Sequence, residues 1–172
     1  MRLAPAVALS VGAMAAIVAV KSGPSPKLGV QVAATCESRA GLPDPTCTPG
    51  ATDPRVTQEN IQQTICVPGY SANVRPPVSV TNPIKAERMR AYGITAAASI
   101  YELDHLIPLS IGGAPRDPKN LWSQAWDGEL GARSKDTLET WLHREVCAGA
   151  ISLVQAQRMA ASNWVDAYRA VR

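Results

Sequence analysis

The sequence predicts a small α+β domain that is mostly helical, contains a short strand that ends in a turn, and is closed by disulfide bonds. Three observations lead to this fold class. Helical patterns with capping signals lie on both sides of a short apolar run, this run ends at a cluster of turn residues, and four cysteines follow an apolar amino-terminal segment. At 172 residues with 46% hydrophobic content, the chain is long enough for one hydrophobic core.

The first 34 residues are typical of an export segment. Residues 3–20 contain no charge and are rich in Ala and Val, and Arg2 and Lys21 flank them. This pattern predicts a secretory signal or an uncleaved amino-terminal membrane anchor, and the small residues 32–34 suit cleavage after Ala34. We therefore expect a secreted protein or one of the periplasm or cell envelope.

Cysteine usage agrees with export. The four cysteines are even in number and all lie beyond the apolar segment, at Cys36, Cys47, Cys66 and Cys147. Two disulfides are expected, and of the three pairings we choose Cys36 with Cys47 and Cys66 with Cys147. The second closes the larger loop and should stabilise more than the first, with a total contribution of about 4 kcal/mol. A structural zinc is disfavoured because the chain has no Cys-x-x-Cys pair.

Ahead of the apolar run, residues 35–56 are rich in Pro and Gly and are expected to form a linker, with a single domain over 57–172. Three elements are expected in the first part of that domain: a short helix over 57–66, an extended or irregular segment over 70–80, and a helix over 82–93. For the last of these, Asn82 is the expected cap and Pro83 lies in the first turn.

Two helices are expected after the apolar run. Leu138, Trp141 and Leu142 recur at helical spacing within 132–146. A capping box of Ser152 and Gln155 precedes a last helix that runs to residue 170, and we expect the two helices to pack together. His143, in the first of them, lies beside Cys147 and is interpreted as structural.

The candidate chemistry lies between Tyr101 and Trp122. The sequence reads Tyr-Glu-Leu-Asp-His-Leu-Ile-Pro-Leu-Ser-Ile-Gly-Gly from residue 101, and Asn120-Leu-Trp follows after a short loop. An Asp can bind a divalent cation and a His can deprotonate water, which are the two needs of phosphodiester hydrolysis. Neighbouring residues of a strand point to opposite faces, so Asp104 and His105 converge only where the strand frays or turns.

At these residues, over roughly 99–140, the chain resembles the HNH (ββα-metal, His-Me finger) endonuclease family. The resemblance implies a strand, a loop, a second strand and a helix that together hold one divalent metal ion. It implies that His105 is the general base, Asp104 a metal ligand, and Asn120 the residue that braces the loop and orients the His105 ring. The implied activity is hydrolysis of DNA or RNA phosphodiester bonds.

The chain departs from that family on the helix. Residues 123–140 contain no His or Asn, so a helix ligand must be a carboxylate: Asp136, Glu139 or Glu129. We favour Asp136, and we expect Asp104, Asp136 and Glu139 around the metal, because Asp136 and Glu139 share a helix face. Oxygen ligands suit Mg²⁺, Mn²⁺ or Ca²⁺ better than zinc. No small-molecule cofactor is expected.

Charge limits how the chain can bind its expected partner, a nucleic acid. The first 34 residues hold three of the 17 basic residues and none of the 14 acidic ones, so the rest carries 14 of each. Binding through bulk charge is therefore not indicated. Arg116, Lys119 and Lys135 are the expected phosphate-binding residues, and solvated surface charge is the competing interpretation for each.

The second function class that the sequence allows is a noncatalytic exported binding or envelope protein that retains a degenerate HNH scaffold. The missing helix histidine and the neutral charge of residues 35–172 favour it. The sequence leaves open the choice of DNA or RNA and the oligomeric state.

Overall fold

The computed structural model describes residues 35–172, which belong to one compact unit. The expected signal or anchor therefore lies outside the described residues. About half of the described residues are helical, and the only sheet among them is a two-stranded antiparallel one. The α+β class with two disulfides is thus confirmed, with a helical share of about half and one two-stranded antiparallel sheet. Within residues 35–172, no helix is both long and apolar enough to span a membrane.

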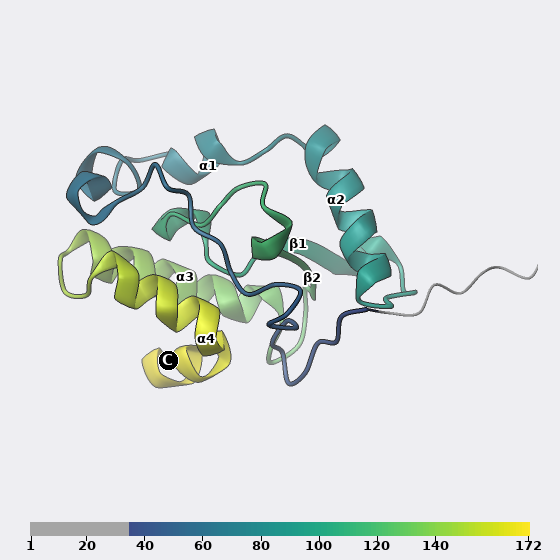
Figure 1. Cartoon of the computed structure of the whole chain (residues 1–172). Helices are drawn as coiled ribbons and strands as arrows, with labels where there is room; N and C mark the ends of the chain where they lie inside the picture. The colour runs from purple at the N-terminus through teal and green to yellow at the C-terminus, as the bar shows by residue number, and fades with distance from the viewer. Residues whose placement is uncertain (1–34) are drawn as a thin grey trace, which may run out of the picture. The chain divides into compact units, whose positions relative to one another are not determined.

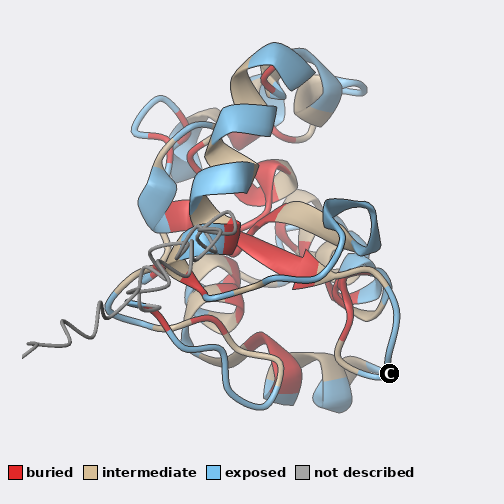
Figure 2. Cartoon of the chain, turned by 90° about the vertical axis from the view of Figure 1, so that its right-hand side faces the viewer, coloured by how far each residue is buried: buried red, intermediate tan, exposed pale blue. Residues whose placement is uncertain are grey.

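The hairpin lies at the centre of the unit (Figure 1). Strand β1 (Tyr101–His105) pairs with β2 (Leu121–Ala125), with Asp104 opposite Trp122 and His105 opposite Leu121. The pairing of β1 with β2 ends at His105. Figure 2 shows a buried strand at the centre and a largely exposed helix α2 (Val78–Ala91) above it. Strand β2 is therefore almost wholly buried, while β1 is buried at Asp104 and His105 and half-buried before them.

Helices α3 (Ala132–Cys147) and α4 (Leu153–Val171) lie side by side and bury the main core between them. The core combines Leu138, Leu142 and Val146 of α3 with Ala156, Ala160 and Trp164 of α4. The expected Ser152–Gln155 capping box is present at the start of α4. Both helices begin and end close to where the sequence pattern places them, because their apolar positions recur with the helical period.

The elements before the hairpin differ from expectation. A short 3-10 helix covers Gln58–Gln63, and α1 (Tyr70–Val74) is a helical turn within a segment expected to be irregular. Helix α2 begins four residues before the expected cap at Asn82, so that Pro83 lies inside it. Pro77 is the N-cap residue instead and has extended backbone. The proline ring restricts φ, and proline has no N–H to donate to the residues before it.

Residues 35–56, expected to form a linker, pack onto the domain. The Asp53 N–H donates to the Gly112 carbonyl at 2.8 Å, and the Gly41 carbonyl accepts from the Trp164 indole at 2.9 Å. Thr48 is fully buried. Pro and Gly here create tight turns along a fixed path, so composition alone does not distinguish this segment from a linker.

The cysteines pair as chosen from the sequence, Cys36 with Cys47 and Cys66 with Cys147. The second disulfide joins residues 81 positions apart and attaches the end of α3 to the region before α1. Two disulfides are compatible with an oxidising compartment.

Candidate functional site

Asp104 and His105 end strand β1, and their side chains find different partners. The Asp104 carboxylate accepts from the Trp122 indole at 3.3 Å and contacts the Lys135 ammonium at 3.0 Å. The His105 ring instead bonds the carbonyl of Pro115 in the following loop. Because the strand stays paired through His105, the alternation of side chains is kept to its last residue. The strand ending does not turn the two side chains onto a common partner.

His105 is arranged as a neutral base. It is only 6% exposed, and its Nε2 lies 3.1 Å from the Pro115 carbonyl oxygen. A carbonyl can only accept, so Nε2 carries the proton and Nδ1 keeps the lone pair. Burial lowers the pKa of His105, which keeps the ring neutral at neutral pH. The ring can therefore accept a proton through Nδ1.

Asn120 holds the loop that follows the strand. Its side chain is fully buried and accepts from the N–H groups of Ile107, at 2.8 Å, and Ala51, at 3.4 Å. Its Nδ2 donates to the carbonyls of Ile107 and Ala114, at 3.0 and 3.2 Å. A Cβ on Gly113 would meet the Ile107 carbonyl oxygen at 1.8 Å, so only glycine allows this close approach.

These contacts refine the role that the resemblance implies for Asn120. No hydrogen bond joins its amide to the His105 ring; the amide fixes the carbonyl of Ala114 instead. The next residue is Pro115, whose carbonyl accepts from the ring. Asn120 is therefore placed to orient His105 through one intervening residue of loop backbone.

Lys135 is the least expected feature of the site. It lies in the first turn of α3 and is 1% exposed, and its Nζ donates to the His105 carbonyl at 2.8 Å. The same ammonium contacts Asp104 and forms an ion pair with Glu139 one helical turn on. Its three N–H donors therefore all have partners inside the protein, which differs from the phosphate-binding role expected from the sequence.

The ammonium stays charged in this position. Burial on its own lowers the pKa of Lys135, but the Coulombic attraction of Asp104 and Glu139 outweighs burial and raises it above the ordinary value. A permanent positive charge therefore lies beside the Asp104 carboxylate.

Further carboxyl groups surround this pair. Burial, followed by repulsion from Asp104 and Asp136, raises the pKa of Glu102 to about 7. Partial loss of solvent around the exposed Asp136, and then repulsion from Asp104, also raise its pKa, and burial raises that of Glu139 despite its contact with Lys135. One lysine thus leaves part of the local negative charge uncompensated.

The expected metal ligands do not fit a divalent ion as they are arranged. Asp104 and Glu139 both bind the Lys135 ammonium, while Asp136 is exposed on α3. The third helix candidate, Glu129, is exposed in the turn before α3. Within residues 35–172, no three His, Cys, Asp or Glu side chains are grouped so as to hold a metal ion. Their oxygen chemistry suits Mg²⁺ or Ca²⁺, but the ammonium takes the shared position.

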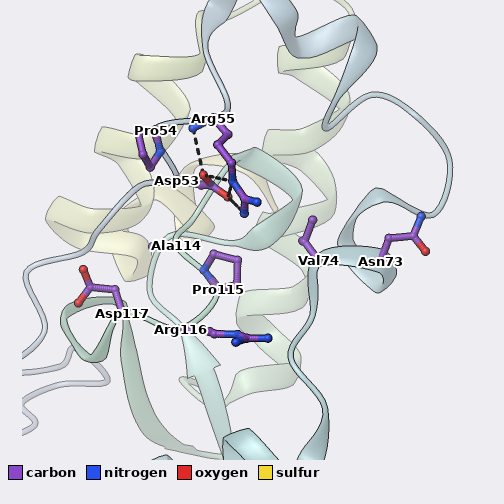
Figure 3. A pocket seen from close by; sticks show the side chains of 9 residues that line it. All are labelled: Asp53, Pro54, Arg55, Asn73, Val74, Ala114, Pro115, Arg116 and Asp117. Carbon is purple, nitrogen blue, oxygen red and sulfur yellow. Dashed lines mark hydrogen bonds and ion pairs between the residues drawn. The ribbon is translucent and has the colours of Figure 1, made fainter.

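A cleft of about 550 Å³ lies on the outer side of the loop, between residues 53–55, the end of α1 and residues 114–117. Figure 3 shows Arg116 extending from the loop below Val74, while Asp117 points away from it. Arg55, above, is held by Asp53 in an ion pair at 2.6 Å. Arg55 and Arg116 are both exposed, but within residues 35–172 only Arg55 of the two forms an ion pair, and Lys119 is exposed on the same loop as Arg116.

Arg75, which precedes two prolines, is a further residue near His105 to which the sequence assigns no role. It is exposed and lines a second cleft, of about 280 Å³, together with Glu102 and His105. Its positive charge adds to burial in lowering the pKa of His105, and it weakly opposes the burial that raises the pKa of Glu102. Pro76 and Pro77 restrict the backbone after it, so the segment that carries Arg75 along this cleft is stiff.

His143 is structural, as interpreted from its place beside Cys147. Its Nε2 donates to the Ile65 carbonyl at 2.9 Å, next to the Cys66–Cys147 disulfide.

Comparisons with models of known families, with curated proteins and with solved structures gave no match. The assignment of a function therefore depends on the geometry around His105 and on the motif residues themselves.

Proposed function

We propose that this protein is an exported nuclease that hydrolyses DNA or RNA phosphodiester bonds at His105. The observation that carries the proposal is the state of His105: a buried, neutral imidazole whose Nε2–H is fixed by a loop carbonyl and whose Nδ1 is available for a proton. The order of strand, braced loop, strand and helix supports the HNH-like interpretation. The two disulfides support export.

The chemistry follows from three groups. Nδ1 of His105 removes a proton from water as the water oxygen attacks phosphorus, and the bond from phosphorus to the leaving oxygen breaks. The Arg75 guanidinium, in the same cleft, binds a non-bridging oxygen and stabilises the charge that develops there. Solvent supplies the proton that the leaving oxygen takes up. Asn120 keeps the loop that aims the ring in place.

The second candidate, a noncatalytic binding or envelope protein with a degenerate HNH scaffold, is favoured by one observation. Lys135 occupies the contact at Asp104 that the family gives to its metal ion. A protein that has lost its metal could retain the fold for binding alone. The two candidates differ in whether a folded chain cleaves nucleic acid.

The test is cleavage of plasmid DNA and of structured RNA by the oxidised full-length chain, with Mg²⁺, Mn²⁺, Ca²⁺ or EDTA. We expect His105→Ala to reduce the rate by about 100-fold or more, the usual contribution of a general base. His143→Ala is the matched control, because His143 is the only other histidine and lies at the disulfide. Equal loss in both variants would contradict the assignment of His105. Absence of cleavage by a folded protein under every condition would favour the binding protein.

Arg75→Ala tests the phosphate contact. We expect a higher KM and a lower kcat, since the guanidinium binds both substrate and transition state, with Arg39→Ala unchanged because Arg39 lies at the surface and pairs with Glu37. An Arg75→Ala rate equal to wild type would remove Arg75 from the mechanism and leave His105 untouched.

A further inference from the structure

We propose that the Lys135 ammonium is the resident cation of this site, and that Asp104 binds no divalent metal ion in the native protein. The inference deepens the proposed function, since it concerns the same site. It differs from the metal-dependent site expected from the family resemblance. It can be tested without substrate.

The contacts of the ammonium carry the argument. An ammonium has three N–H donors, and here they meet the Asp104 carboxylate, the Glu139 carboxylate and the His105 carbonyl. These are oxygen atoms, the kind of ligand that a hard divalent cation selects. Lys135 therefore binds the atoms that such an ion would need.

Burial makes the exchange of one cation for another difficult. Lys135 is 1% exposed, so an arriving ion would have to displace a long side chain that is packed into the base of α3. If the ammonium stayed, two positive charges would stand a few ångströms apart in a region with little water to screen them. Displacement of the Lys135 side chain and retention of its charge therefore both disfavour a metal ion at Asp104.

The helix sequence gains an explanation from this arrangement. Residues 123–140 contain neither His nor Asn, the side chains that the family places on its helix. Lys135 in the first turn of α3 brings a positive charge to Asp104 instead of a ligand for one. A site whose cation is an ammonium needs no metal ligand on the helix. The missing helix His or Asn and the buried Lys135 then have one explanation.

The first test is Mn²⁺ binding by the metal-free, oxidised full-length chain, followed by water-proton relaxation, in wild type and in Asp104→Asn. We expect no binding that depends on Asp104. A saturable wild-type site that Asp104→Asn removes would overturn the proposal. Equal binding in both proteins places the ion elsewhere and supports it.

The second test restores the position of the ion. Lys135→Met removes the ammonium and keeps most of the stem, which leaves Asp104 and Glu139 without a cation. We expect this variant to bind Mn²⁺ at least about tenfold more tightly than wild type, and Mn²⁺ to raise its melting temperature. Lys119→Met is the control, because Lys119 is exposed on the loop. A folded Lys135→Met that gains no binding would overturn the claim that the ammonium stands in for a metal ion.

Two further measurements can overturn the proposal even if Lys135→Met is unstable. If Lys135→Met does not fold, the comparison of wild type with Asp104→Asn decides alone. If the chain is a nuclease, its cleavage should persist in EDTA, and activity that requires a divalent ion bound through Asp104 would contradict the proposal. A chain without nuclease activity leaves the Mn²⁺ measurements valid, so failure of the proposed function is distinguishable from failure of this inference.

Discussion

Asn120 and Lys135 both hold the backbone at the end of strand β1, and they do so in physically different ways. Both side chains are almost wholly buried, and both bind backbone next to the catalytic candidate: Asn120 at Ile107, and Lys135 at the carbonyl of His105. The amide is neutral, and backbone groups satisfy all its bonds. The ammonium is charged and needs two carboxylates as well.

The difference shows what each region contributes. A neutral amide in a closed set of backbone hydrogen bonds fixes shape and leaves the charge of the site unchanged. A buried ammonium fixes charge: Asp104 and Glu139 gather around it, and their repulsion, after burial itself, raises the pKa of nearby Glu102. The loop region thus determines where the His105 ring lies, and the α3 region determines the electrostatic field that it experiences.

Removal of the Lys135 ammonium should have the largest effect on the free energy of unfolding. Lys135→Met leaves the buried Asp104 and the half-buried Glu139 without a counter-charge, and removing one partner of a buried ion pair costs about 3–5 kcal/mol. Denaturant unfolding of the oxidised chain measures this free energy. The exposed Lys119→Met should change it by less than about 0.5 kcal/mol. A Lys135→Met cost as small as that of the control would show that the buried pair is not a structural anchor.

A negative charge at position 120 should destabilise the loop that the neutral Asn120 amide holds. Asn120→Asp keeps the size but places a carboxylate oxygen against the carbonyls of Ile107 and Ala114, which accept from Nδ2 in the native protein. We expect a loss of about 3 kcal/mol at neutral pH. Acidification should relieve it, because the protonated acid can again donate. Equal destabilisation at pH 4 and pH 7 relative to wild type would contradict this account.

Much of the fold could be predicted from local signals, and the misses share one cause. Helices α3 and α4 and the disulfide pairing follow from apolar periodicity, capping residues and cysteine position, while the second strand was expected from the family resemblance. The early start of α2 and the packing of residues 35–56 depend on contacts with distant parts of the chain, such as the bond from Asp53 to Gly112. No local pattern records such contacts.

The site divides in the same way. The motif singled out Asp104, His105 and Asn120, because an Asp-His pair before a Gly-Gly loop is an unusual local pattern. Lys135 was expected to bind phosphate or to be solvated, because lysine is seldom buried. Its burial is determined by where α3 meets β1, which depends on the tertiary fold. Arg75 was missed for the same reason.

Double-mutant cycles measure whether Lys135 is coupled to Asp104 and whether it is coupled to Asn120. Asp104→Asn should reduce the cost of Lys135→Met, because the amide needs no counter-charge. We expect a coupling free energy of about 2 kcal/mol between the two residues. The matching cycle between Asn120→Ala and Lys135→Met should give less than about 0.5 kcal/mol, as no contact joins those two side chains. Equal coupling in both cycles would mean that the two anchors act as one network.

The smallest effect concerns Glu102, which reports the field made by the α3 region. Its pKa is raised from 4.5 to about 7, first by burial and then by Asp104 and the two helix carboxyls. A raised carboxyl pKa in the folded state means that Glu102 imposes no penalty below pH 4.5 and a growing one up to pH 7, so folding stability should fall across that window.

Unfolding free energies of wild type and Glu102→Gln between pH 4 and 8 isolate this term by difference, since the other carboxyls are present in both proteins. Wild type should lose less than about 1 kcal/mol relative to the variant, because Glu102 is partly exposed and solvent screens its charge. A difference that stays constant from pH 4 to 8 would show that Glu102 keeps an ordinary pKa. The charge of Lys135 would then be enough to compensate the acidic cluster.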